Sequence, residues 1–163
     1  MPRAQDRGGP EFKSQDFKSH AEQLSQTVAA GRPLVIREHA GWDRDCAAIA
    51  HPALYLDEAP RHGTVCARVE EITIGSIYLG TEKHCVGRLV RGVRLIYRPD
   101  TGYAGIDALR YAAQYPSLRR TVAVNVTVAA SGVTGSLPSS LGAHLPARHQ
   151  APGPVPHCVD LMF

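Results

Sequence analysis

Short runs of alternating apolar and polar residues fill the middle of this 163-residue chain. The clearest run is 121–129 (TVAVNVTVA), in which Val122, Val124, Val126 and Val128 occupy alternate positions. Side chains alternate between the two faces of a strand, so this run predicts a strand with one packed face and one solvated face. Six further strands are predicted at 33–39, 53–57, 63–72, 73–79, 92–98 and 107–115.

Glycine and proline turns separate these runs, and no helical pattern of about 12 residues comes between them. About seven short antiparallel strands with regular turns predict an all-β sandwich over residues 33–130. The polar segment 1–32 is predicted to be flexible. Within it, a short amphipathic helix is an alternative, because apolar residues recur there at helical spacing. Prolines interrupt residues 131–163 repeatedly, which predicts a disordered tail.

Composition narrows the possible functions. Hydrophobic residues make up 44% of the chain and charged residues 20%, which is enough for a folded core. Residues 33–130 contain twelve Arg or Lys and ten Asp or Glu, and no basic cluster stands out. This balance argues against nucleic-acid binding. No run approaches the roughly 18 to 20 apolar residues of a membrane span. The polar start lacks the apolar segment of a signal peptide.

One motif is more specific than these propensities. It reads Y-x-P-x-x-G-Y-x-G-x-D-x-x-x-Y and is built on Tyr97, Pro99, Gly102, Gly105, Asp107 and Tyr111. Pro99 is expected to end a strand, because proline lacks an N–H for the next ladder bond. The two glycines permit positive φ in a tight corner. Asp107 is expected to accept hydrogen bonds from backbone N–H groups of the turn.

This motif resembles the closing part of bacterial immunoglobulin-like and cadherin-like domains of envelope and secreted proteins. The segments around Trp42–Cys46, 60–65 and 85–88 are similar to small exported proteins of that type. The resemblance implies an immunoglobulin-like fold and a periplasmic or extracellular location. It also implies that Tyr111 acts as the aromatic of a tyrosine corner. The implied function is a non-catalytic structural or binding module, with an unidentified protein or glycan as its partner.

Four cysteines allow three sets of pairings. The resemblance implies a Cys46–Cys85 disulfide, which requires an oxidising compartment. Cys66 lies on the opposite face of its predicted strand from Val65 and Ala67, and we expect it to be a free thiol. Four reduced thiols are the alternative. A small periplasmic zinc- or copper-binding protein is the alternative function. Its candidate ligands would be His39, His62, His84, Cys46 and Cys85. Because no C-x-x-C or H-x-x-x-H spacing arranges these residues, no metal site or cofactor is predicted.

The remaining candidates carry weaker signals. Loop carboxylates suit calcium chemically, but they form no dense D-x-D-x-D loop; they are Asp43, Asp45, Asp100 and Asp107. Trp42 is the only tryptophan, and we expect it to pack near Cys46 rather than to form an exposed stacking platform. Common catalytic motifs such as G-x-S-x-G, the Walker loop and H-E-x-x-H are absent from the sequence. We therefore expect a protein that is not an enzyme.

Overall fold

The computed structural model describes residues 18–75, 83–130 and 149–159. These ranges contain strands, one 3-10 helix (η1, Lys83–Cys85) and no α-helix, in agreement with the all-β prediction. Within them, no helix is long and apolar enough to cross a membrane.

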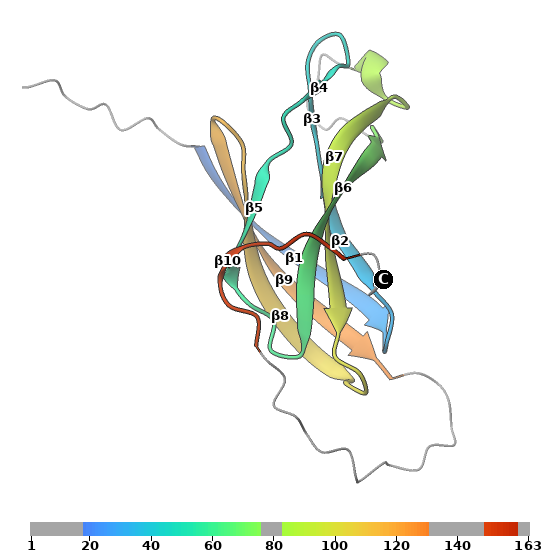
Figure 1. The fold of residues 1–163 in the computed structure, drawn as a ribbon, viewed down its shortest axis with the longest axis vertical. Coiled ribbons are helices and arrows are strands. Elements are labelled where there is room, and N and C mark those ends of the chain that lie inside the picture. Colours follow the sequence, from blue (N-terminus) through green and yellow to red (C-terminus); the bar gives the residue numbers. More distant parts are fainter. Residues whose placement is uncertain (1–17, 76–82, 131–148, 160–163) are drawn as a thin grey trace, which may run out of the picture.

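Two main sheets carry the fold (Figure 1). The larger sheet has the order β1-β9-β8-β5-β10 and the smaller sheet β2-β7-β6. The strands of the larger sheet are β1 (Lys18–Ala29), β9 (Leu118–Ala129), β8 (Gly105–Gln114), β5 (Ala53–Glu58) and β10 (Gly153–Pro154). Those of the smaller sheet are β2 (Leu34–His39), β7 (Leu89–Pro99) and β6 (Gly63–Thr73). A separate short pair joins β3 (Gly41–Trp42) to β4 (Ala48–Ile49).

The main hydrophobic core draws side chains from both sheets. All four valines that alternation placed on the packed face of β9 are at most 2% exposed. Val93, Leu95 and Tyr97 of β7 are buried as predicted, and so are Leu109 and Tyr111 of β8. The alternation of apolar residues therefore identified the packed faces of these three strands correctly.

Residues 18–29 form a strand rather than the predicted flexible segment or short helix. β1 pairs with β9 over twelve residues, and the two strands run parallel, unlike the antiparallel pairs predicted throughout. Leu24 and Val28 lie four residues apart, a spacing that suits one face of a helix but also one face of a strand. The long ladder to β9 selects the strand, because it gives the backbone of β1 hydrogen-bond partners along its length.

A second correction concerns the C-terminal strap, which we define as residues 150–158 (Figure 1, red). The strap first pairs with β5, where the Val155 N–H donates to the Leu54 carbonyl oxygen at 3.0 Å. It then reaches β6, where Ala67 exchanges two hydrogen bonds with it, at 2.8 and 2.9 Å. Val155 is 9% exposed and belongs to the main core. This part of the predicted disordered tail thus occupies the edges of both sheets.

A disulfide fixes the end of the strap. Cys158 bonds to Cys66 of β6, 92 residues earlier in the chain. Cys66 is therefore not the free thiol expected from the sequence. It points away from the main core, since Val65 and Ala67 on either side of it belong to that core. The Gln150 side chain adds two hydrogen bonds to the backbone of Val65, at 2.8 and 2.9 Å.

A smaller hydrophobic cluster lies beyond the main core. Its buried members are Cys46, Ile74, Cys85 and Val90, and Ala40 and Trp42 pack against them. Residues 73–79 were predicted as a separate strand, but Thr73 is the last residue of β6, and residues 76–79 lie outside the described ranges.

Candidate functional site

The predicted motif builds the turn between β7 and β8. Pro99 is the last residue of β7. Gly102 and Gly105 have φ angles of 80° and 141°, as the motif predicts. A β-carbon on Gly105 would also lie 2.9 Å from the Tyr103 hydroxyl oxygen, so both the backbone angle and the available space favour glycine there.

Asp107 holds this turn together. It is 3% exposed, and its carboxylate accepts four hydrogen bonds of 2.8 to 3.0 Å. The donors are the N–H groups of Arg61, His62 and Ala108 and the hydroxyl of Tyr97. Burial and the bond to Asp107 raise the pKa of Tyr97. With four donors on its two oxygens, Asp107 serves the structure of the turn rather than a calcium ion.

The other candidate calcium ligands are not arranged around an ion. Asp43 Oδ1 accepts hydrogen bonds from the N–H groups of Asp45 and Ala47 and so shapes its own loop. Asp100 lies in the β7–β8 turn, where its backbone bonds to His62 and Tyr103. Carboxylates from these two loops do not form a ligand group in the described part of the chain.

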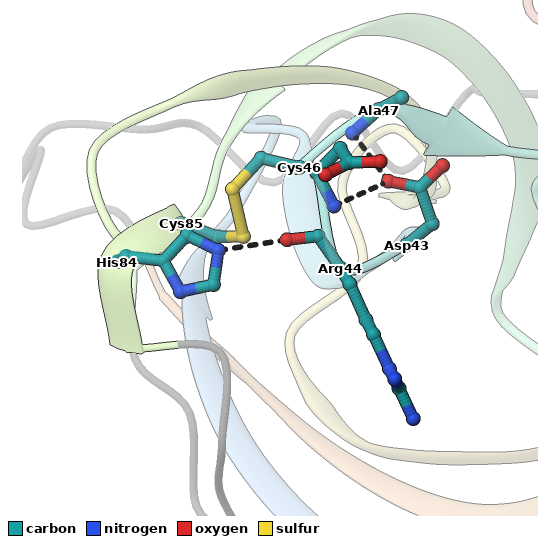
Figure 2. Close-up of a disulfide and its surroundings, with 7 residues drawn as sticks. Asp43, Arg44, Cys46, Ala47, His84 and Cys85 are labelled. Atoms are coloured by element: carbon teal, nitrogen blue, oxygen red, sulfur yellow. Dashed lines mark hydrogen bonds between the residues drawn. A yellow bond between two sulfur atoms is a disulfide. The ribbon is translucent and has the colours of Figure 1, made fainter.

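The Cys46–Cys85 disulfide implied by the resemblance is present (Figure 2). It joins the loop after β3 to η1, across 39 residues of sequence. Cys46 has a positive φ of 63°, a conformation that non-glycine residues rarely adopt. The bonds to Asp43 support this loop from one side, and His84 supports it from the other, with Nε2 lying 2.7 Å from the carbonyl oxygen of Arg44.

The five candidate metal ligands are only partly brought together. Cys46, His84 and Cys85 offer ligand atoms within 4.8 Å of one another. Both sulfur atoms are bonded to each other, so neither is the thiolate that a metal binds. His62 stacks on Tyr103 with ring centroids 4.0 Å apart, and His39 is buried between two tyrosines.

Sequence reasoning missed the environment of His39. This residue is 3% exposed, and its Nε2 lies 2.8 Å from the Tyr111 hydroxyl. Its Nδ1 lies 3.3 Å from the hydroxyl of Tyr115. Tyr111 therefore does not form the expected tyrosine corner, because its hydroxyl meets a histidine from the opposite sheet rather than nearby backbone. A β-bulge between Val35 and Arg37 shifts the register of β2 and turns His39 inward.

His39, Tyr111 and Tyr115 form the His39 cluster, and two of them, His39 and Tyr115, line a cavity of about 380 Å³, the His39 pocket. Its lining residues are Arg37, Glu38, His39, Ala40, Trp42, Ile72, Thr73, Ile74, Gly75, Val90, Tyr115, Leu118 and Arg120. Trp42 packs against the smaller hydrophobic cluster around Cys46, as expected, and also lines this pocket.

The electrostatics of the pocket keep His39 neutral. Burial, the largest cause, and the nearby cations Arg37 and Arg120 together lower the pKa of His39 from 6.5 to about 4, against the opposing effect of Glu22. Burial also raises the pKa of both Tyr111 and Tyr115. At neutral pH the cluster is therefore a set of uncharged hydrogen-bonding groups. His39 and Tyr115, whose pKa values are shifted, line the pocket, which makes it the candidate functional site.

Comparisons with known proteins identify no family. No protein-family model matches the chain, and a search of curated proteins gives no match. Among solved structures, PbICP-C in complex with falcipain-2 is 14% identical with a TM-score of 0.38, and the match covers 68% of this chain and 90% of that one. The solution structure of Amebosin is 14% identical with a TM-score of 0.32, and that match covers 67% and 97%. Likenesses this low carry no argument about family or function.

Proposed function

We propose that this chain is a non-catalytic, immunoglobulin-like module of the bacterial envelope that binds a protein or glycan partner. The observation that carries the proposal is that all four cysteines are paired in two disulfides. Reducing compartments seldom retain structural disulfides, whereas the periplasm and the cell exterior do. The immunoglobulin-like assignment is supported by two sheets around one core, with the antiparallel pair β6–β7 in one sheet and β8–β9 in the other.

The His39 pocket supports binding rather than catalysis. Both ring nitrogens of His39 already form hydrogen bonds, each with a tyrosine hydroxyl. In addition, a histidine whose pKa is about 4 is a poor general base at neutral pH. Among the hydrogen bonds of the described residues, none joins a serine or a cysteine to His39 in the manner of a nucleophile and its base. The same groups serve well as fixed donors and acceptors for a ligand.

Peptide mapping without reduction, on protein taken from its own cell, tests the proposed compartment. The expected result is two linked peptides, one joining Cys46 to Cys85 and the other joining Cys66 to Cys158. The protein should also fractionate with the periplasm or the culture medium. Free thiols at all four positions in protein alkylated before lysis would contradict an envelope location.

Metal binding is a second candidate, favoured by the close approach of Cys46, His84 and Cys85. It applies to the reduced protein, in which the two cysteines can supply thiolates. Titration of reduced protein with zinc and with copper(I) tests it. A metal role requires stoichiometric binding that His84→Ala weakens. His62→Ala is the matched control, because His62 stacks on Tyr103 outside this cluster. Equal binding by both variants would rule out the cluster as the site.

A further inference from the structure

The charged groups of the His39 pocket are unevenly paired. Arg37 forms an ion pair with Glu22, and Glu38 accepts a hydrogen bond from Arg94 at 2.6 Å. The side chain of Arg120 has no hydrogen-bond or ion-pair partner among residues 18–75, 83–130 and 149–159. The pocket therefore presents one cation whose charge is not neutralised by a direct partner in this part of the chain.

The hydrogen bonds of His39 determine which side chain of the pocket has a hydrogen-bond donor left for a ligand. Tyr111 is 0% exposed, and within the described residues its hydroxyl has only His39 as a partner. Because a buried hydroxyl hydrogen needs an acceptor, Tyr111 donates to Nε2 of His39. Neutral histidine then carries its hydrogen on Nδ1, which donates to the Tyr115 hydroxyl oxygen 3.3 Å away.

This chain of donors leaves the Tyr115 hydroxyl hydrogen without an assigned acceptor. Tyr115 lines the pocket and is only partly buried, so its hydroxyl can donate to a bound ligand. Arg120 likewise offers only donors. The complement of a guanidinium and a hydroxyl donor is a negatively charged acceptor group.

A carboxylate fits this site better than a phosphate. Arginine binds either group through two parallel N–H bonds. A phosphate, however, carries about 1.5 to 2 negative charges at neutral pH, more than the single charge of Arg120 can balance. The Glu38 carboxylate also lines the pocket and repels the additional negative charge of a phosphate. One free cation in the pocket wall matches one negative charge on the ligand.

The rest of the pocket sets the size of the ligand. Trp42, Ile74 and Val90 supply apolar wall next to the polar groups. A volume of about 380 Å³ is at the lower end of the range for small-molecule sites. It accommodates a single ring that carries one acidic group, and the partly buried indole of Trp42 offers such a ring a flat apolar surface.

We propose that the His39 pocket binds the carboxylate of a small, single-ring ligand, through the Arg120 guanidinium and the Tyr115 hydroxyl. The inference rests on the proposed function, since it names the ligand class of the proposed binding module. Two sources share this chemistry, a free organic acid and an acidic sugar at the end of a glycan.

The single tryptophan provides the readout. Trp42 lines the pocket, so its fluorescence in the purified, oxidised protein can be followed during titration, with calorimetry on the same samples. The probes are glucuronate for the acidic sugar and benzoate for the free acid. Glucose and benzamide are the uncharged controls, and inorganic phosphate tests the competing anion. We expect saturable binding of at least one carboxylate, with no comparable binding of its uncharged control or of phosphate.

Matched variants locate the binding. Arg120→Gln should weaken carboxylate binding about tenfold or more, because it removes a charge-assisted contact. Tyr115→Phe should weaken it by a smaller factor, about threefold to tenfold, because it removes one hydrogen-bond donor. Arg119→Gln is the control and should leave affinity unchanged. Arg119 is the residue before Arg120 in β9, but it does not line the pocket, and it pairs with Asp57 at 3.3 Å.

Several outcomes would overturn the inference. These are equal binding of the uncharged controls, tighter binding of phosphate, equal effects of the two arginine variants, or no saturable binding of either carboxylate by both methods. Preference for glucuronate over benzoate would assign the site to a glycan, and the reverse to a free acid. Failure here is distinguishable from failure of the proposed function, because disulfide mapping does not depend on the pocket.

Discussion

His39 lies between two tyrosine hydroxyls and close to three charged side chains, and its neutral form is part of the folded structure. In the unfolded chain its pKa is about 6.5. Above that pH the residue is neutral in both states. As the pH falls from 6.5 to about 4, the unfolded chain takes up a proton that the folded protein excludes, so the free energy of unfolding falls. Below about 4 both states are protonated.

His39→Gln tests this linkage. From the size of the pKa difference, the wild-type protein should lose about 3 kcal/mol of stability through this residue between pH 6.5 and pH 4. The variant should be less stable than the wild-type protein at pH 7. Between pH 6.5 and pH 4, however, its free energy of unfolding should fall by about 3 kcal/mol less than that of the wild-type protein. Urea unfolding at several pH values measures how the free energy of unfolding of each protein changes with pH. Parallel pH profiles for the two proteins would show that His39 does not titrate in this way.

Asp107 supports a second prediction at the scale of single residues. Asp107→Asn replaces a carboxylate that accepts four hydrogen bonds by an amide with only one acceptor oxygen. We expect a loss of about 2 to 4 kcal/mol, measured by urea unfolding. Asp100→Asn in the same turn is the control and should change stability by less than about 0.5 kcal/mol, because the recorded bonds of Asp100 use its backbone. Equal losses would contradict the assigned role of Asp107.

Among the larger elements, the C-terminal strap depends on its disulfide. Replacing both Cys66 and Cys158 with serine should release the strap, since the contacts that remain are a few edge hydrogen bonds, the two bonds of the Gln150 side chain, and Val155. Hydrogen exchange should then accelerate at the N–H groups that hold the strap, those of Ala67, Val155 and the residue at position 158. Amides between β8 and β9 should stay protected.

The control for the strap prediction is the other disulfide. Replacing Cys46 and Cys85 with serine should leave the strap amides protected, because this bond lies in the loop after β3 and η1. Both double variants should lose stability, by about 4 to 5 kcal/mol for the longer loop and about 4 kcal/mol for the shorter one in the chain-entropy model. Strap amides that stay protected without Cys66 and Cys158 would contradict the prediction.

The same elements show what the sequence could predict. Strands β7, β8 and β9 were predictable because their apolar residues alternate and their partners lie close in sequence. β1 was not, since its few apolar residues fit a helix equally well, and the deciding ladder runs to a strand about 100 residues away. The strap was missed because its prolines indicate disorder. Pro154 and Pro156 instead flank Val155, whose N–H is the donor to β5.

The candidate site was less predictable than the fold. Cys46 and Cys85 were found through a resemblance, but four cysteines alone allow three pairings. The His39 pocket combines residues from both main sheets, and the inward turn of His39 depends on a bulge that local alternation does not reveal. Side chains that meet only through tertiary packing leave no periodic signal in the sequence.

At the scale of the whole molecule, the edge strands on the two sides of the fold are held together in different ways. The strap covers β5 and β6 with backbone hydrogen bonds. On the other side, β1 and β2 are edge strands of their sheets in the described part of the chain. They are connected by side chains, through the Glu22–Arg37 ion pair and a 3.0 Å bond from Gln26 Nε2 to the Ile36 carbonyl oxygen. Unpaired strand edges promote association between chains.

We therefore expect that deletion of residues 149–163 causes the protein to self-associate. The deletion should be made with Cys66→Ser, so that a free thiol cannot link two chains. Light scattering after size-exclusion chromatography should show a mass that rises with concentration more steeply than for the full chain, because β5 and β6 become open edges. Deletion of 160–163 alone is the control, since it retains Cys158. Equal masses for all three proteins would contradict a protective role of the strap.

The strap also has a consequence for the order of events during biosynthesis. Its residues are synthesised after both strands that they contact, β5 and β6, yet they supply a core side chain, edge hydrogen bonds and one half of a disulfide. The parallel ladder between β1 and β9 likewise waits until β9 has been made, about 100 residues after β1. The fold therefore cannot be completed before residue 158 has been made. Until Cys66 and Cys158 are oxidised, only edge hydrogen bonds, the Gln150 side chain and Val155 hold the strap in place, so the strap becomes covalently fixed only where thiols are oxidised.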